Sequence, residues 1–513
     1  MKNTKFLYFL LLLPLLSFCG TQKDDPDPIS DPDKDKPKEE VKAEIKITSD
    51  KVFNVQCAAG TVSVAFTCNT DWTIATNDSW VTVNTTKGAA SSDPVNVSIS
   101  YEENASLNPR TSDIYIFAGK INETVSITQA GNPMIGAAEE LKSGSTVLAT
   151  NPNVEKFLTE VTYPDKDWSY TKVLDYYGGF NGKTYNENGV EDPNGKMFNW
   201  ANEPDSDKPM SYSIRWAAED MEDGAMTLFL EDNLGWKEEI SIKAGSRYVN
   251  VTNLVPNDQY TYKVTTAGGK VLAEGNFSTT GHLHQVFFAK ACRNGRDLGG
   301  WTTLDGKTIK YRKLYRGGRM EEITASTGGL EAIAQGIGAE LDLRNDDRLS
   351  KAAVSGLDFC APGIEQGGTY MLTKGNENGN FTKQCFEFVV NSLRAGKGVY
   401  FHCSLGRDRT GTFDILLLGL LGVREGDISK AYEVTYFAPV GYSVSSSERD
   451  NNPTPVFKNT RKAWVYSEVA PYFWKMAEET TNGTFAEGVE KYLLEVAGVS
   501  QQDIDDFRNM MLE

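Results

Sequence analysis

The sequence predicts a multidomain protein in which two all-β sandwiches are followed by an α/β domain with a central sheet flanked by helices. Residues 44–132 and 205–282 carry short runs of alternating apolar and polar residues separated by turn residues, a pattern typical of antiparallel sandwiches. Residues 399–412 instead place a polar loop between an apolar strand and an apolar helix. The 513 residues, 40% of them hydrophobic, suffice for several packed cores.

The first 43 residues predict an exported chain. Lys2 and Lys5 precede an apolar run at 6–18 that is too short to span a bilayer, so residues 1–19 are interpreted as a signal peptide. The run ends in Leu-Ser-Phe-Cys, which resembles the lipobox of bacterial lipoproteins and implies lipidation of Cys19 and anchoring to the outer membrane, at the cell surface. Ordinary secretion, with Cys19 cleaved away, is the alternative. Residues 20–43 form an acidic, Pro-rich tether.

Residues 44–132 are expected to form the first sandwich, with strands at 61–66, 95–99, 113–117 and 124–127. The segments 69–72, 80–83 and 127–131 resemble the BACON module, and this resemblance implies a glycan as a binding partner. Trp72 and Trp80 lie among alternating strand residues, so we expect them in the core rather than in a sugar platform. Spacing and stabilisation are the alternative role of this module.

Residues 133–204 remain unassigned, apart from an expected helix at 153–159. Strands are expected at 212–216, 225–230, 248–251, 260–265 and 275–279. Leu254-x-Pro256, followed by Tyr260-x-Tyr262, is similar to a fibronectin type III sandwich, which places that domain at residues 205–282. Such modules usually position other domains, so we assign it no chemistry.

Charge and composition restrict the partners. The net charge of −18 argues against a nucleic acid partner. The three histidines, at 282, 284 and 402, form no ligand set with the cysteines, so the sequence predicts neither a metal nor another cofactor. Cys57 and Cys68 lie in the same module, and their pairing stays open. Several arginines between 293 and 348, together with Arg407 and Arg409, predict a basic pocket for a phosphorylated substrate.

The loop between the strand expected at 398–401 and the helix expected at 413–421 carries the chemistry. Cys403 and Arg409 are separated by five residues, which is the spacing of a phosphate loop whose backbone N–H groups and following helix bind an anion. In that field Cys403 is expected to be a thiolate nucleophile. Arg409 would hold the phosphoryl oxygens, and Thr410 would donate a hydrogen bond to the sulfur.

The segment HCSLGRDRTG resembles the loop HC-x-x-G-K-D-R-T-G of bacterial cysteine-dependent tyrosine and lipid phosphatases, and the resemblance covers residues 283–513. Upstream, residues 296–300, 315–318 and 342–344 resemble that family's N-R-D-L-G-G, Y-R-S-G and D-L-R signatures. Arg407 replaces a lysine, and Leu405 replaces a small residue. The resemblance implies that substrate is bound or the loop supported by the following residues: His402, Ser404, Leu405, Gly406, Arg407, Arg296 and Arg316.

A phosphatase of this kind needs a general acid for the leaving oxygen. The candidates are Asp342 and Asp408, and we favour Asp342. The alternative role of Asp342 is to pin Arg344 or a loop amide, and that of Asp408 is to orient Arg296. Asp297 is expected to bond loop backbone.

The sequence therefore predicts an exported, lipid-anchored phosphatase that hydrolyses phosphate monoesters through a cysteinyl-phosphate intermediate. Phosphotyrosine peptides, phosphoinositide lipids and inositol phosphates are the candidate substrates. The alternative is a surface glycan-binding protein with an inactive phosphatase-like domain. We also expect helices at 425–436 and around Gly498 within 489–511, and a substrate-selecting lid at 367–380.

Overall fold

The computed structural model describes residues 42–160, 162, 206–217, 224–288, 292–320, 328–345, 351–364, 372, 379–438 and 464–513. The chain divides into two compact units, Met1–Gly131 and Asn132–Glu513. Cys19, the tether up to residue 41 and residues 367–371 and 373–378 of the expected lid lie outside the described residues. None of the helices within the described ranges is long and apolar enough to cross a membrane.

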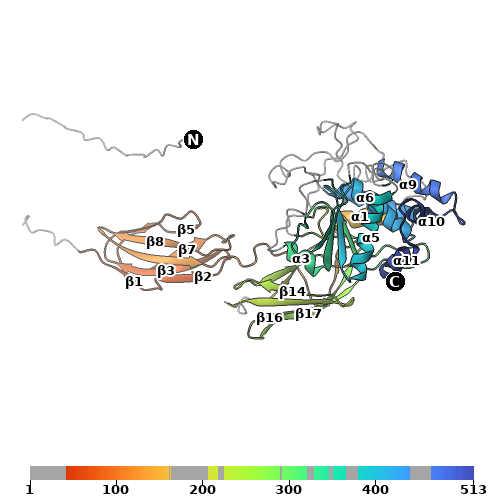
Figure 1. Cartoon of the computed structure of the whole chain (residues 1–513). Helices are drawn as coiled ribbons and strands as arrows, with labels where there is room; N and C mark the ends of the chain where they lie inside the picture. The colour runs from red at the N-terminus through yellow and green to blue at the C-terminus, as the bar shows by residue number, and fades with distance from the viewer. Residues whose placement is uncertain are drawn as a thin grey trace, which may run out of the picture. The chain divides into compact units, whose positions relative to one another are not determined.

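The described part of the first unit is a two-sheet β structure (Figure 1). All four expected strands are present within longer ones, and Trp72 is buried in the core as expected, whereas Trp80 is half-buried beneath the Arg110 guanidinium. Cys57 and Cys68 are both free thiols. In sheet order the strands are β1 (Ile45–Ile47), β3 (Gly60–Cys68), β7 (Ser91–Tyr101) and β5 (Val81–Val83), and β2 (Val52–Val55), β9 (Ile121–Gln129), β8 (Arg110–Ala118), β4 (Trp72–Thr76) and β6 (Lys87–Gly88).

The second unit begins with another pair of sheets, which contain all five strands expected between 212 and 279. They also contain two short strands from the segment that the sequence left unassigned: β10 (Glu139–Glu140) pairs with β12 (Tyr212–Arg215), and β11 (Thr146–Leu148) pairs with β17 (Val271–Thr280). The sheet members in order are β10, β12 and β15 (Tyr248–Val251), and β11, β17, β16 (Gln259–Thr266), β13 (Met226–Asp232) and β14 (Lys237–Ile242).

The remainder of the second unit is an α/β region, so the expected order of all-β sheets before an α/β domain is confirmed. Its sheet runs in the order β18 (Arg296–Asp297), β19 (Leu314–Gly317), β22 (Gly398–His402), β20 (Ile337–Asp342) and β21 (Asp358–Cys360). The strands from β19 to β21 are parallel, and only β18 runs antiparallel to its neighbour.

The central strands β19, β20 and β22 are buried along nearly their whole length, as is typical of parallel strands covered on both faces, although they carry Arg316, Glu340, Asp342 and His402. Leu314 and Phe401 point into one hydrophobic cluster, whereas their neighbours Tyr315 on β19 and Tyr400 on β22 point into a second cluster. Helices α3, α5 and α6 pack against the sheet strands. Within the described residues the helices are α1 (Pro152–Glu160), α3 (Gly328–Ala334), α5 (Asn380–Arg394), α6 (Asp408–Leu420), α7 (Glu425–Glu433), η4 (Val434–Phe437), α9 (Trp464–Ala477), α10 (Phe485–Lys491), η5 (Tyr492–Val496) and α11 (Gln501–Met511).

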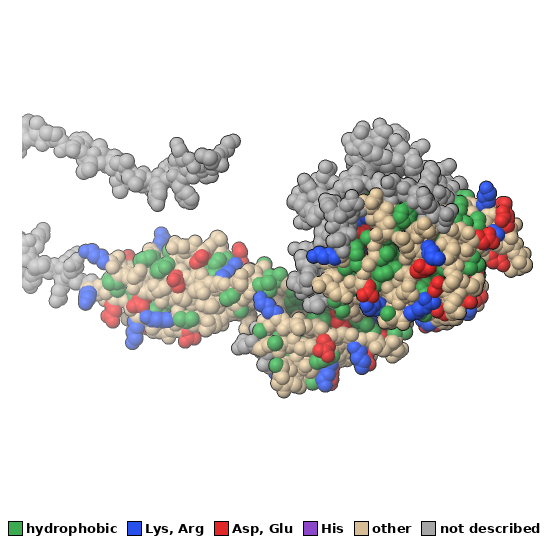
Figure 2. Space-filling view, in the orientation of Figure 1, with side chains coloured by type: hydrophobic (Ala, Val, Ile, Leu, Met, Phe, Trp, Pro, Cys, Tyr) green, Lys and Arg blue, Asp and Glu red, His purple; other side chains and the backbone are tan. Residues whose placement is uncertain are grey.

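Helix α1 is the expected helix of the unassigned segment, and it belongs to the core of the α/β region. Val154, Phe157 and Leu158 are buried in the larger hydrophobic cluster, and the Phe157 ring lies 5.4 Å from that of Phe437. The expected helix at 425–436 is an α-helix that ends in the 3₁₀ turn η4, and the two helices around Gly498 are α10 and α11 with the π turn η5 between them. Figure 2 shows acidic and basic side chains interspersed on the visible face of each unit.

Candidate active site

The loop at residues 403–407 joins the central strand β22 to helix α6, which begins at Asp408 rather than at the expected Phe413. Gly406 has a φ of 67°, a left-handed conformation that glycine adopts without strain. A Cβ atom at this position would lie 2.3 Å from the backbone of Gly317 at the end of β19. The loop is therefore pressed against the neighbouring strand, and only glycine fits there.

Cys403 lies at the start of this loop, 4% exposed. Burial alone would raise the pKa of its thiol, but the Arg409 charge and hydrogen bonding by the Thr410 hydroxyl and backbone amide outweigh it, so the pKa is lowered. The Thr410 hydroxyl is buried and has no hydrogen-bond partner among the described residues, so it is available to turn toward the sulfur. The structure thus brings the expected nucleophile, cation and hydroxyl together.

Arg409 lies in the first turn of α6 and is 7% exposed. Its Nη1 donates to the Ile364 carbonyl at 2.8 Å and approaches the Leu343 carbonyl at 3.5 Å. These carbonyls fix part of the guanidinium beside Cys403. The rest of its planar fork can still donate to an anion bound in the loop.

Asp408 forms an ion pair with Arg407, with 2.8 Å between Nε and Oδ1. Both side chains are partly exposed, at 18% for Arg407 and 28% for Asp408. Arg296 does not contact Asp408, because its guanidinium donates to Asn294 and to the Ala431 carbonyl. The alternative expectation that Asp408 orients Arg296 is therefore wrong. The Asp408 carboxylate is instead partly exposed, at the end of the loop where α6 begins.

Asp342 occupies the alternative role that the sequence left open for it. It is 1% exposed and accepts hydrogen bonds from the Arg344 backbone amide, Nε and Nη2 at 2.6–3.1 Å. Burial would raise the pKa of Asp342, but the hydrogen bonds from Arg344 and the nearby charge of His402 lower it overall. A carboxylate held in this way stays ionised, which suits an anchor for Arg344 better than a proton donor.

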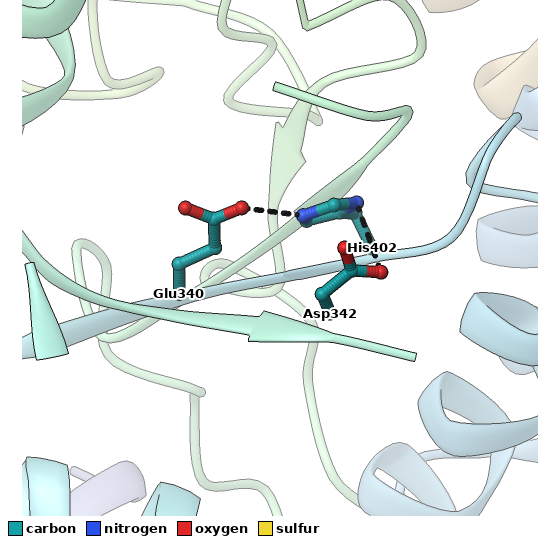
Figure 3. A group of neighbouring side chains, drawn as sticks. All are labelled: Glu340, Asp342 and His402. Atoms are coloured by element: carbon teal, nitrogen blue, oxygen red, sulfur yellow. Dashed lines mark hydrogen bonds and ion pairs between the residues drawn. The ribbon is translucent and has the colours of Figure 1, made fainter. Parts of the chain in front are cut away.

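His402 lies between two buried carboxylates, Glu340 and Asp342 (Figure 3). Its Nε2 is 3.0 Å from Glu340 Oε1, and its Nδ1 is 3.1 Å from the Cys403 carbonyl and 4.0 Å from Asp342 Oδ1. A carbonyl only accepts, so Nδ1 carries a proton. Burial would lower the pKa of His402, but the two carboxylates raise it overall. Both carboxylates thus favour the protonated ring, whose Nδ1 holds the Cys403 carbonyl.

These three side chains are close enough to share a metal ion, since their ligand atoms lie within 4.8 Å of one another. Their hydrogen bonds do not fit that role. A histidine ligand must offer an unprotonated nitrogen, whereas one ring nitrogen here faces a carbonyl and the other a carboxylate. Glu340 also accepts from the Ala353 amide at 2.6 Å. We therefore interpret the group as a buried charge cluster.

Further contacts hold the back of the loop. Arg316 donates to the Gly406 carbonyl at 2.6 Å and forms a buried ion pair with Asp414. Asn294 donates to the Leu405 and Gly406 carbonyls at 3.2 and 3.1 Å.

Ser404 is half-buried, and its carbonyl accepts from the Arg319 amide at 3.3 Å. Sequence reasoning missed Asn294, Glu340 and Asp414. For Asp414 a signal existed, because a lone acid inside an apolar helix requires a partner.

Comparison with known proteins identifies two parts of the chain. Residues 288–513 match the model of the "Tyrosine phosphatase family", and residues 70–130 match the BACON model, described as "Putative binding domain, N-terminal". A curated Cupriavidus necator protein, named "Putative tyrosine-protein phosphatase", is 30% identical over 162 residues, which cover 27% of this chain and 59% of that protein. The match therefore spans less than two thirds of that relative.

Solved structures add little. A Bacteroides ovatus GH5 xyloglucanase complex is 15% identical, covers 23% of each chain and has a TM-score of 0.17. The NMR structure of a Bacteroides thetaiotaomicron protein is 14% identical, covers 22% of this chain and 97% of that one, and has a TM-score of 0.13.

Proposed function

Because residues 288–513 carry a tyrosine phosphatase family domain, we propose that the protein hydrolyses phosphate monoesters through Cys403. The observation that carries the proposal is the Cys403 thiol itself. It lies at the start of the loop that leads into α6, and its pKa is lowered because Arg409 and Thr410, in the first turn of that helix, favour the thiolate over the cost of burial. A helix N-terminus and a nearby guanidinium also favour a bound phosphate.

The reaction has two steps. The Cys403 sulfur attacks phosphorus, the S–P bond forms and the P–O bond to the leaving group breaks, while the general acid gives its proton to the departing oxygen. Water then attacks the cysteinyl phosphate and gives its proton to the same carboxylate. Inorganic phosphate leaves, and the thiolate is restored. Arg409 and the loop amides hold the phosphoryl oxygens as charge spreads over them.

We assign the general acid to Asp408 rather than to Asp342, which the sequence favoured. Asp342 is buried, ionised and bound through both oxygens to Arg344. Asp408 is 28% exposed and is the first residue of α6, directly after the loop that holds Cys403. Its partner Arg407 is also partly exposed, so substrate can reach and displace that ion pair.

The proposed substrates are phosphotyrosine peptides, phosphoinositides or inositol phosphates. Arg407, at the mouth of the loop, supports a substrate with negative charge beyond the reacting phosphate. We keep the export of the chain, its lipid anchor at Cys19 and its place on the outer membrane as parts of the proposal that rest on the sequence alone.

The experiment is phosphate release, without added metal, by purified residues 20–513 from a phosphotyrosine peptide, phosphoinositides and phytate. Cys403→Ser should abolish release from whichever substrate is best. Cys360→Ser is the matched control, because Cys360 is a free, half-buried thiol on β21 of the same sheet and should be dispensable. If the folded, reduced wild-type protein leaves all three substrates untouched at pH 5–7, the proposal is wrong.

A second candidate function, glycan binding by the first unit, is favoured by one observation. Tyr115 and Phe117 are two residues apart on β8, so they share the face of the sheet opposite the core, and their rings stack with centroids 6.2 Å apart. Phe117 is 39% exposed. Stacked, exposed aromatic rings are suited to the apolar faces of sugars. A glycan array with residues 44–132 and with Tyr115→Ala tests it, and binding that Tyr115→Ala leaves unchanged would exclude this surface.

A further inference from the structure

A buried carboxylate, Asp207, supports the phosphate loop through Arg293 and Asn294. It precedes residues 288–513, which match the phosphatase family, and the function proposed above does not use it. Asp207 precedes β12 and is 3% exposed. Its two oxygens accept from Arg293 Nε and Nη2 at 2.8 and 2.6 Å, and Oδ2 also accepts from the Asn294 amide at 2.9 Å. Three hydrogen bonds, two of them from a cation, therefore fix residues 293 and 294.

The Asn294 side chain connects these contacts to the phosphate loop. Its Nδ2 donates to the Leu405 and Gly406 carbonyls and to the Thr435 hydroxyl, at 3.1–3.3 Å. Its Oδ1 accepts from Arg296, so the orientation of the amide is settled by its partners. Asp207 and Asn294 are buried, and the Arg293 side chain is 19% exposed.

The backbone around Asn294 needs such support. Cys292 and Asn294 have φ values of 64° and 62°, in the left-handed region that residues other than glycine rarely adopt. In this conformation the Asn294 side-chain amide reaches the carbonyls of Leu405 and Gly406, next to the left-handed turn at Gly406. Loss of the Asp207 contacts would remove the hydrogen bonds that hold this turn in place.

Asp207 is itself held by its neighbours in the sequence. The Ser206 hydroxyl accepts from Asn153 at 3.0 Å, and the Ser206 carbonyl accepts from Gln285 at 3.2 Å. The Lys208 carbonyl accepts from Asn151 at 3.3 Å. The segment is thus fixed to the start of α1 and to the strand-like segment before the phosphatase match, so Asp207 has a defined position from which to act.

We propose that Asp207 is a positioning residue of the phosphate loop, acting through Arg293 and Asn294 on the Leu405 and Gly406 carbonyls. The inference rests on the proposed function, because it assigns a role in the same reaction. If so, residues 288–513, which match the phosphatase family, lack one residue needed for full turnover, and the preceding part of the second unit supplies it. By holding the carbonyls outward, the contacts keep the loop N–H groups turned toward the phosphate.

Asp232 provides a matched control. Its side chain is also fully buried, and it also accepts from one arginine, Arg312, and from one backbone amide, that of Trp236. Arg312 precedes β19, whereas the phosphate loop contacts Gly317 at the opposite end of that strand. Replacing either aspartate by asparagine removes the same charge from the same kind of contact, but only Asp207→Asn reaches the loop.

The test uses the full chain after the signal peptide and two readouts. Asp207→Asn should lower kcat/KM for phosphate release toward about 100-fold, the effect of displacing a catalytic group by about 1 Å, mainly through kcat. It should also move the alkylation of Cys403 by iodoacetamide to higher pH, followed by mass spectrometry of the Cys403 peptide. Asp232→Asn should change either readout by no more than about threefold.

If Asp207→Asn does not fold, Asn294→Gly replaces it, because glycine keeps the left-handed φ and deletes only the amide. This variant should give the same loss and the same alkylation shift. Equal effects of the Asp207 and Asp232 variants on both readouts, or no effect of either, would overturn the inference. If the wild-type protein releases no phosphate, the proposed function fails, and the alkylation profiles alone still decide the role of Asp207.

Discussion

The buried ion pair between Arg316 and Asp414 gives a sharp prediction about stability. Each side chain is 1% exposed, and together they join β19 to α6 beneath the phosphate loop. Asp414→Ala would leave the Arg316 charge buried with the Gly406 carbonyl as its remaining partner. Breaking a buried pair by removing one member costs about 3–5 kcal/mol, because the other charge is left uncompensated.

The exposed pair Lys397–Asp358 is the control. Its side chains are 38% and 50% exposed, so Asp358→Ala should cost about 0–1 kcal/mol. Hydrogen exchange of the β22 and α6 amides measures the unfolding free energy of this region in both variants, because such core amides exchange only through large-scale opening. An Asp414→Ala loss no greater than that of Asp358→Ala would refute the reasoning.

A double variant separates stability from function. Replacing Arg316 by Met and Asp414 by Leu removes both charges and fills the space with apolar groups, which is often neutral or stabilising. The double variant should therefore recover most of the unfolding free energy lost in Asp414→Ala. It should not recover phosphate release, because the hydrogen bond from Arg316 to the Gly406 carbonyl is gone. Recovery of both would show that this bond does not matter for turnover.

Two further predictions concern the same region. Gly406→Ala should abolish phosphate release, because its Cβ would lie 2.3 Å from the Gly317 backbone. Gly396→Ala is the control: Gly396 has a similar φ of 74° but open space around it, so the variant should lose about 1–2 kcal/mol of stability and keep full activity. Equal phosphate release by the two variants would contradict the steric explanation. The raised pKa of His402 stabilises the fold below the usual histidine pKa of about 6.5, and this contribution is lost as pH rises through the folded value. Glu340→Gln should flatten that fall in unfolding free energy above pH 6.5, and an unchanged slope would exclude the contact as its cause.

Alternation and spacing in the sequence predicted most of the strands and the placement of the candidate nucleophile. The strands that follow a period of two over five or more residues, such as β8 and β16, were found where expected because alternation reports burial on one face. Strands β10 and β11 have two and three residues, too few for any period, and they form because a neighbouring strand is available. Helix α9 was missed, since Pro471 in its interior argues against a helix locally.

The contacts of the site could not be predicted in the same way, because they join residues far apart in the chain. Spacing brought Cys403, Arg409 and Thr410 together, since they belong to one loop. For Asp342 the sequence offered two roles, proton donor or anchor of Arg344, and spacing could not decide between them. Nor could it place Asp207 against Arg293 and Asn294, because those contacts are set by the packing of two segments that lie 86 and 87 residues apart in the sequence.

The most direct measurement is the isolation of the covalent intermediate. Asp408→Asn keeps Cys403 and its activating partners but removes the carboxylate that activates water, so the phosphoenzyme should accumulate with a substrate whose leaving group needs no proton, such as p-nitrophenyl phosphate. Acid quench and mass spectrometry should find one phosphate on the Cys403 peptide, with none in the Asp408→Asn, Cys403→Ser double variant. Phosphate release by that double variant, or phosphate found on another residue, would contradict a reaction through the Cys403 thiolate.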